Sequence, residues 1–222
     1  MVVVDIDVIS DFVCAWCYIG KRTLENAITL YQKTYPGGKN DVFSVTWRPY
    51  YLNYNPSSQS VDKRELMETK FSGMSSEQVT AITQRVTQIG RSVGINFKSG
   101  GKIGSTRDAH RLIRLSQTKS PDVQNALVDK LFEAYHELEK DISSQDVLRE
   151  IAIDAGLGGA EVDECLNSSL SGDTVDDEAL KNRKMVNSGV PTFLVQGVHR
   201  VDGSQDPQEF LEAFIKVKEG EL

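Results

Sequence analysis

Two cysteines three positions apart are the first residues of this chain whose type and spacing favour a chemical role. Cys14 and Cys17 lie in the stretch SDFVCAWCYIGK, and only one further cysteine, Cys165, occurs among the 222 residues. Two thiols at this spacing can bind a metal ion, form a structural disulfide, pack as an inert pair or exchange electrons with another disulfide.

The remaining metal-ligating residues argue against zinc. A zinc site takes four ligands, commonly two Cys-x-x-Cys pairs or one pair with histidines. Only Cys165 and three histidines remain here, and none of them is paired at a ligand spacing. We therefore expect no metal at the motif.

The expected compartment argues against a structural disulfide. The first ten residues, MVVVDIDVIS, contain no basic region, and Asp5 and Asp7 interrupt their apolar run, so they do not resemble a signal peptide. We expect a cytoplasmic protein, and disulfides rarely persist in a reducing cytosol. An inert buried pair stays open, because free cysteines often pack in cores.

Redox chemistry is the alternative that the sequence favours. An apolar pattern with helical spacing (Leu24, Ala27, Ile28, Tyr31) follows the motif, which places Cys14 at the start of a helix. Unpaired backbone N–H groups and the helix dipole favour a negative sulfur there. Thiols in such motifs have pKa values between roughly 3.5 and 7.5, against about 8.5 for a free cysteine. We expect Cys14 to attack as the thiolate and the deeper Cys17 to resolve the mixed disulfide.

The dipeptide between the cysteines affects the expected reduction potential. Neither Ala15 nor Trp16 carries a positive charge that would hold a thiolate. We therefore expect a potential less oxidising than that of a protein with histidine beside its nucleophile. Trp16 is also expected to be exposed and to contact the substrate.

The elements that must position the motif follow from the apolar patterns. Strands are predicted over 2–9 and 41–52, with the helix between them ending at Pro36–Gly38, which makes a βαβ unit. Two further strands are predicted over Thr192–Gly197 and His199–Gly203. Asp206 and Pro207 mark the start of a last helix.

The middle of the chain has the texture of helices. Ser75 and Gln78 form a capping-box pattern before one of them. The predicted class is α/β, with one mixed sheet built from both ends of the chain and a large all-helical insertion between the βαβ and ββα halves. The predicted domains are 1–61 with 189–222, and 62–188.

A second signal lies in GVPTF, where Val190 and Pro191 precede the third predicted strand. Pro191 is either a helix terminator or a cis proline, and cis bonds occur at only about 5–6% of X–Pro positions. Ser204 and Gln205, in the stretch DGSQ, either belong to a simple turn or offer hydrogen bonds to a peptide or to glutathione.

Together these stretches resemble a known family. The Cys14–Cys17 pair followed by YIGK, the GVPTF run, the DGSQ run and the helical segment DAHRLIRL resemble the DsbA-like thioredoxin-fold oxidoreductases, with FrnE as the closest branch. The resemblance implies a thioredoxin domain with a helical insertion, and a cis proline at Pro191 that faces the cysteines. It also implies disulfide exchange or isomerisation on protein or small-thiol substrates. The branch usually carries proline where this chain has Ala15.

Composition limits the partners. The formal net charge of −7 argues against a nucleic-acid groove or an anionic membrane surface, and no run of about 18 apolar residues is present. We expect a monomer or homodimer that needs no cofactor beyond its redox-active disulfide. Its expected partners are a disulfide-containing protein or small thiol, with glutathione as a possible co-substrate, and an unidentified recycling reductase.

The predicted activity is therefore that of a thiol–disulfide oxidoreductase or disulfide isomerase. Two alternatives stay open. One is a glutathione-dependent transferase or isomerase of the kappa type, related to 2-hydroxychromene-2-carboxylate isomerases, which share this inserted layout and use a single hydroxyl where Cys14 stands. The other is a non-enzymatic binding module or holdase that uses the helical insertion.

Overall fold

The computed structural model describes residues 1–54, 56, 59–168, 171–186, 188–203 and 206–220. The chain forms two compact units, one of Met1–Tyr50 with Leu180–Leu222 and the other of Tyr51–Ala179. The sequence predicted domain boundaries at residues 61/62 and 188/189. The structure divides the chain at 50/51 and 179/180, about ten residues earlier in each case.

The first unit is built around a four-stranded mixed sheet with strand order β2-β1-β5-β6. Its strands are β1 (Val3–Ser10), β2 (Val42–Pro49), β5 (Thr192–Val195) and β6 (His199–Asp202). The central strand β1 runs parallel to β2 and antiparallel to β5, and β5 pairs antiparallel with β6. The two ends of the chain therefore share one sheet, as the sequence predicted.

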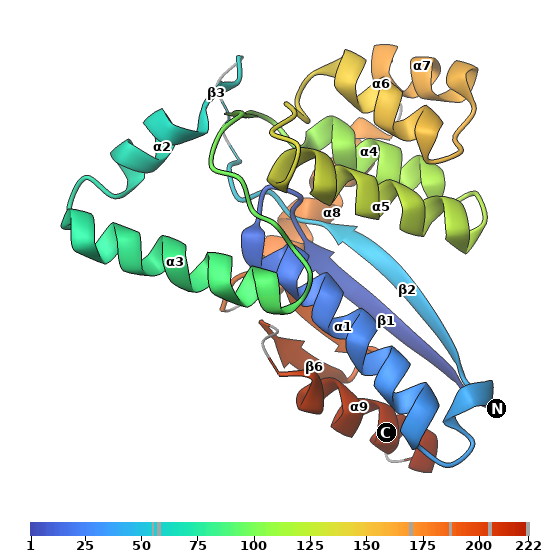
Figure 1. The fold of residues 1–222 in the computed structure, drawn as a ribbon. Helices are drawn as coiled ribbons and strands as arrows, with labels where there is room; N and C mark the ends of the chain where they lie inside the picture. Colours follow the sequence, from blue (N-terminus) through green and yellow to red (C-terminus); the bar gives the residue numbers. More distant parts are fainter. Residues whose placement is uncertain (55, 57–58, 169–170, 187, 204–205, 221–222) are drawn as a thin grey trace. The chain divides into compact units, whose positions relative to one another are not determined.

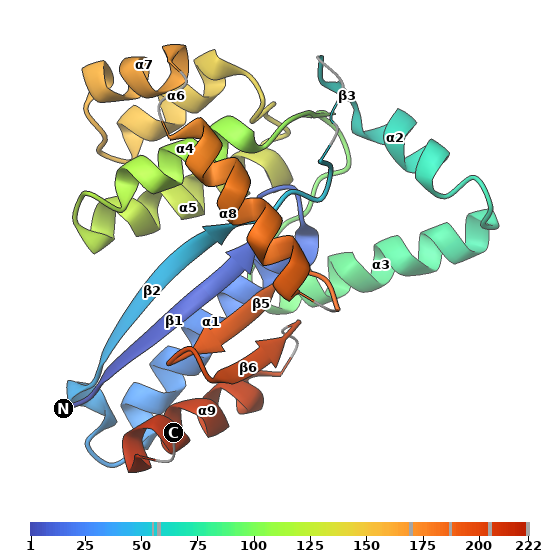
Figure 2. The same ribbon diagram turned by 180° about the vertical axis from the view of Figure 1, so that it is seen from behind.

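Helices α1 (Ala15–Thr34) and α9 (Pro207–Glu219) pack against each other on this sheet. Figure 1 looks onto the side of the sheet where α1 lies, and Figure 2 shows the strands from behind. Val4, Ile6 and Val8 alternate along β1 and are each 1% exposed, so they form the sheet's contribution to the core. The rings of Tyr31 in α1 and Phe214 in α9 pack edge to face in the same core.

The second unit is helical. It contains α2 (Lys63–Lys70), α3 (Ser76–Ser92), α4 (Arg107–Ser116), α5 (Pro121–His136), α6 (Gln145–Asp154), α7 (Gly159–Asn167) and the first half of α8 (Gly172–Met185). Helices α4, α5, α6 and α7 pack together (Figure 1). The capping box predicted at Ser75 and Gln78 is confirmed, with both of its hydrogen bonds present.

Three features differ from the sequence prediction. A two-stranded ladder of β3 (Val61–Asp62) and β4 (Lys102–Ile103) was missed, because two residues per strand carry no period. A short 3-10 turn, Gly38–Asn40, follows α1. The third predicted strand ends at Val195 rather than Gly197, because Gln196 and Gly197 adopt left-handed φ values of 53° and 70° in the hairpin turn.

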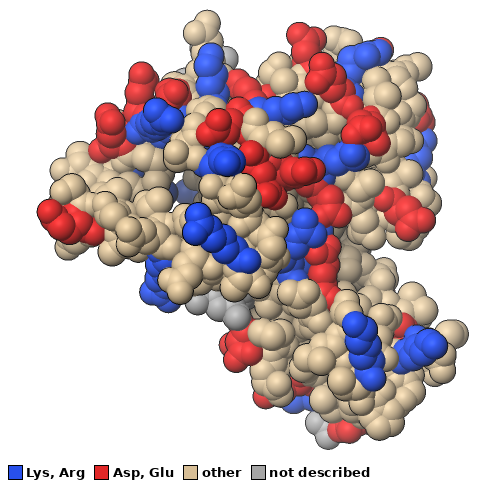
Figure 3. All heavy atoms as spheres, in the orientation of Figure 1, with Lys and Arg blue, Asp and Glu red and all other residues tan. Residues whose placement is uncertain are grey.

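The surface shown in Figure 3 carries acidic and basic side chains interspersed over the face in view. None of the helices formed by the described residues is long and apolar enough to cross a membrane. Over the same part of the chain, His, Cys, Asp and Glu side chains nowhere gather in threes in a way that would hold a metal ion.

Candidate active site

Cys14 is the N-cap residue of α1. Its backbone is extended, its N–H donates to the Asp11 carbonyl at 3.1 Å, and its sulfur accepts the Cys17 backbone N–H at 3.3 Å. A sulfur thus occupies the place where Ser, Thr, Asp or Asn usually caps a helix. The first turn of α1 contains no acidic residue. The Cys17 N–H therefore reaches the sulfur with no carboxylate of the same turn competing for it.

Cys17 lies one turn deeper and is 1% exposed, against 7% for Cys14. Burial raises the pKa of the Cys17 thiol well above its ordinary value, and the adjacent Cys14 sulfur adds to the increase. The Asp11 backbone N–H and the Ser10 hydroxyl act in the opposite direction without offsetting it. Cys17 is therefore a protonated thiol at neutral pH.

Val190 and Pro191 lie next to Cys14 although they are far away in the sequence. The Cys14 sulfur is 3.7 Å from the Val190 carbonyl oxygen, and the Val190–Pro191 peptide bond is cis. Strand pairing explains this proximity, because Ile9 near the end of β1 is in register with Thr192 at the start of β5. The residues that follow β1 and those that precede β5 must then meet at the same edge of the sheet.

A polar network holds the segment before β5. The Thr192 hydroxyl donates to Asp202 Oδ1 at 2.8 Å, and Arg200 Nε lies 2.9 Å from both oxygens of that carboxylate. The Gly203 N–H donates to the Pro191 carbonyl at 2.9 Å. The sequence singled out none of these side chains, since a lone Thr, Arg or Asp beside a hairpin carries no distinctive signal.

The other predicted site residues fall in three places. Trp16, predicted to be exposed, is instead half-buried in the first turn of α1, and Val190 is also half-buried. Ser204 and Gln205 lie outside the described residues. The structure therefore brings Cys14, Cys17, Val190 and Pro191 together. The roles predicted for Ser204 and Gln205 stay predictions.

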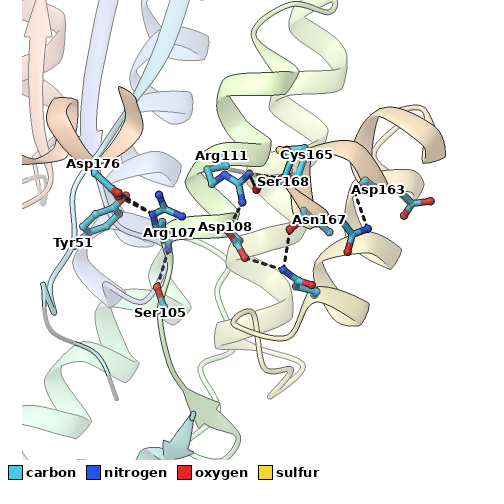
Figure 4. Close-up of polar contacts among 12 residues, drawn as sticks. Tyr51, Ser105, Arg107, Asp108, Arg111, Asp163, Cys165, Asn167, Ser168 and Asp176 are labelled. Atoms are coloured by element: carbon cyan, nitrogen blue, oxygen red, sulfur yellow. Dashed lines mark hydrogen bonds and ion pairs between the residues drawn. The ribbon is translucent and has the colours of Figure 1, made fainter. Parts of the chain in front are cut away.

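Cys165 belongs to the helical unit and is 3% exposed. Figure 4 shows it beside Arg111, whose guanidinium donates to the carbonyl oxygens of Cys165 and Ser168 and pairs with Asp108 at 2.7 Å. These bonds satisfy carbonyls at the end of α7, which is a structural role. Burial raises the pKa of the Cys165 thiol. This cysteine is a packed core thiol of the insertion.

The family model for the DSBA-like thioredoxin domain matches residues 5–215, nearly the whole chain. The chain belongs to this family. The predicted resemblance and the predicted thioredoxin-like fold class are thereby confirmed.

Known proteins of this kind are similar over most of the chain. A probable DsbA oxidoreductase from Streptomyces coelicolor superposes with a TM-score of 0.82 at 25% identity, covering 99% of this chain and 91% of that one. The uncharacterized protein YwbO of Bacillus subtilis is 27% identical over 86% of each chain. The cytosolic disulfide reductase DsbM of Pseudomonas aeruginosa, solved also with GSH, shares the fold at 16% identity and a TM-score of 0.61, over 98% of this chain and 100% of its own.

Proposed function

We propose that this member of the DSBA-like family is a thiol–disulfide oxidoreductase that works through Cys14 and Cys17. One observation carries the proposal: the Cys14 sulfur caps α1, accepts the Cys17 N–H and lies 3.7 Å from the Val190 carbonyl. This arrangement gives the Cys14 sulfur a backbone N–H donor at the helix start, a second thiol one turn away and the Val190 carbonyl as a backbone acceptor.

The proposed exchange has two steps. The Cys14 thiolate attacks one sulfur of a substrate disulfide, the substrate S–S bond breaks, and the leaving sulfur departs as a thiolate with the electron pair. Cys17 then loses its proton and attacks the Cys14 sulfur. A Cys14–Cys17 disulfide forms and the second substrate thiolate leaves, so the substrate gains two electrons and the protein loses two. The same steps in reverse oxidise a dithiol.

The substrate is proposed to lie along the segment before β5. The half-buried Val190 offers a backbone carbonyl next to Cys14, and an extended peptide or a small thiol can align its own N–H with it. Trp16, in the first turn of α1, supplies apolar contact beside the sulfur. Disulfide-containing proteins and glutathione both fit this chemistry, and no cofactor is required beyond the two cysteines. A reducing compartment would keep the resting protein as the dithiol.

The test is a pair of activity assays with matched variants. We expect the wild-type protein to reduce insulin and to reactivate scrambled ribonuclease, and we expect Cys14→Ser to lose both activities. Cys165→Ala serves as the control, because it removes a buried thiol in the other unit and should retain activity. Full activity of Cys14→Ser would overturn the proposal.

Cys17→Ser separates the alternatives. Under the proposed function, this variant still reacts at Cys14 but accumulates the mixed disulfide and stops turning over. A kappa-type glutathione transferase or isomerase would keep most of its activity, since it needs only the first residue. A holdase would suppress aggregation of an unfolded client equally well in Cys14→Ser and in the wild-type protein.

A further inference from the structure

Ser10 is a buried polar residue at the end of β1, directly before the segment that leads to Cys14. Strand alternation places its side chain on the same face of β1 as Val4, Ile6 and Val8, each of which is 1% exposed. The residue is 2% exposed. A buried serine at the end of this apolar row lowers the core's hydrophobicity and therefore calls for an explanation.

The hydroxyl of Ser10 is poorly satisfied in the dithiol protein. Its Oγ is inaccessible to solvent and makes no hydrogen bond of normal geometry with any described residue. It nevertheless lies close enough to the Cys17 thiol to lower its pKa, as the Asp11 backbone N–H also does. A neutral thiol is a weak acceptor, whereas a thiolate is a strong one. The Ser10 hydroxyl is therefore suited to donate a hydrogen bond to the Cys17 thiolate, which forms only during exchange.

We propose that Ser10 is a catalytic residue of the resolving step, whose hydroxyl donates a hydrogen bond to the Cys17 thiolate as it forms and attacks Cys14. The inference rests on the proposed disulfide exchange and extends it to a residue outside the Cys-x-x-Cys motif. Cys17 releases its proton to solvent, its sulfur bonds to Cys14, and the substrate sulfur leaves with the electron pair. Ser10 keeps its own proton throughout and stabilises the charge that develops on Cys17.

This role follows from differential stabilisation. A bond that strengthens as the thiolate forms lowers the barrier of the resolving step without strengthening the resting state equally. Burial raises the pKa of Cys17, so the resolving thiolate is scarce and donors to it have a large effect. Of the groups that act on that sulfur, Cys14 is titratable, and the nearby stretch of chain also carries the Asp11 carboxyl and the Lys21–Glu25 pair, which begins one turn further along α1. All of them stay unchanged in the variants below.

The experiment follows both steps in one trace, in a Cys165→Ala background. Reduced protein is mixed with the disulfide 5,5′-dithiobis(2-nitrobenzoate) in a stopped-flow instrument. The first release of the coloured thiolate reports attack by Cys14, and the second reports resolution by Cys17. The trace is repeated across pH for Ser10→Ala, for Ser10→Thr, which keeps a hydroxyl, and for Thr23→Val, which removes a different buried hydroxyl of α1 that bonds the Ile19 carbonyl.

We expect Ser10→Ala to slow the second phase by about ten- to a hundredfold, the effect of one hydrogen bond to a charged group, and to move its pH midpoint up by about one unit. The first phase should stay within about twofold of the background protein. Ser10→Thr should restore most of the second phase, and Thr23→Val should leave both phases unchanged.

A second phase in Ser10→Ala within twofold of the background protein would overturn the role of Ser10 and leave the exchange function standing. If the background protein itself shows no second phase, the proposed function fails as well. If Ser10→Ala does not fold, the second phases of Ser10→Thr and Ser10→Val are compared instead. These two side chains have the same shape and differ only in the hydroxyl. Equal second phases in that pair would refute the inference.

Discussion

Cys14 and Cys17 have the same side chain and lie three residues apart, yet their surroundings differ. Cys14 accepts a backbone N–H and retains 7% exposure, whereas Cys17 is buried and its pKa is raised. The helix start creates this asymmetry, because it gives the first sulfur the unpaired backbone donors and turns the second toward the core. The sequence predicted an order for the two roles but pointed to no role for Ser10, since a single serine at a strand end has no motif; the role of Ser10 is proposed from the structure.

The reduction potential depends on the residues between the cysteines. Neither Ala15 nor Trp16, the residues between the cysteines, carries a positive charge that would stabilise the thiolate of the reduced form. We expect a potential clearly more negative than about −120 mV, the strongly oxidising end of the range. Trp16→His should move it to a less negative value, because an imidazolium next to Cys14 favours the reduced form. Equilibration with glutathione buffers measures both potentials, and an unchanged or more negative value in Trp16→His would contradict the argument.

At the scale of the elements, the register between β1 and β5 assembles the site. Pairing of Ile9 with Thr192 brings Cys14 and Val190 together across 176 residues of sequence. The strands could be predicted because β-branched residues with a period of two recur in the sequence. The register could not, because it depends on which residues face each other after a helical insertion has intervened. The Thr192–Asp202–Arg200 network is likewise visible only once β5 and β6 pair.

A second buried network joins the ends of the first unit. The Asp41 carboxylate has no exposed side-chain surface and accepts hydrogen bonds from Lys218 Nζ at 2.7 Å, from the Val2 N–H at 2.8 Å and from the Tyr31 hydroxyl at 3.0 Å. Burial by itself raises the pKa of Asp41, but these donors outweigh it and hold the pKa below the ordinary value.

Asp41→Ala should therefore lower the free energy of unfolding by about 3 kcal/mol, because Lys218 loses its buried partner. The stabilisation is present above the unfolded-state pKa of about 3.9 and is lost as pH falls through the depressed folded-state pKa. Urea denaturation at pH 7 and pH 3 measures both effects. A variant as stable as the wild-type protein at pH 7 would show that the network contributes nothing.

Lys63, the first residue of α2, carries a pH dependence of the same sign in a more alkaline window. Its Nζ donates to the Tyr135 carbonyl at 2.6 Å and lies 3.5 Å from the centre of the Tyr135 ring. Burial lowers the pKa of Lys63 to about 8, although Glu139 and Asp141 favour the charged form.

The unfolded chain, with a lysine pKa of about 10.4, binds more protons than the folded one between about pH 8 and pH 10. The Lys63 contribution to stability therefore rises with pH across that window. The difference in unfolding free energy between wild type and Lys63→Met should change accordingly, and NMR titration of the Lys63 side chain should give a midpoint near pH 8. A midpoint near 10 would contradict this account.

At the scale of the whole molecule, the chain divides into two units of different build. The proposed chemistry lies in the first unit, while the second is a helical insertion whose parts differ in how much they bury. Helix α2 has no buried residue and α3 has only Gly90, whereas α4 and α5 bury most of one face. Composition and periodicity predicted that the middle of the chain is helical. They could not distinguish helices that bury a face from helices that bury almost nothing, because α3 is as amphipathic in sequence as a core helix.

Low burial predicts low local stability. In hydrogen exchange followed by mass spectrometry, we expect the amides of α2 and α3 to exchange at least about tenfold faster than those of α4 and α5. Equal protection would contradict the expectation for an isolated chain and would indicate that a second copy covers α2 and α3. Sedimentation of the same sample distinguishes the two cases.

The most direct test of the central claim is a redox titration of Cys14 and Cys17 themselves. The protein is equilibrated in a series of glutathione buffers, the thiols are quenched and tagged, and the peptide that contains both cysteines is quantified by mass. The account predicts one two-electron transition in which both thiols disappear together into an internal disulfide. Thiols that stay free in the most oxidising buffer, or that form separate glutathione adducts without an internal disulfide, would contradict it.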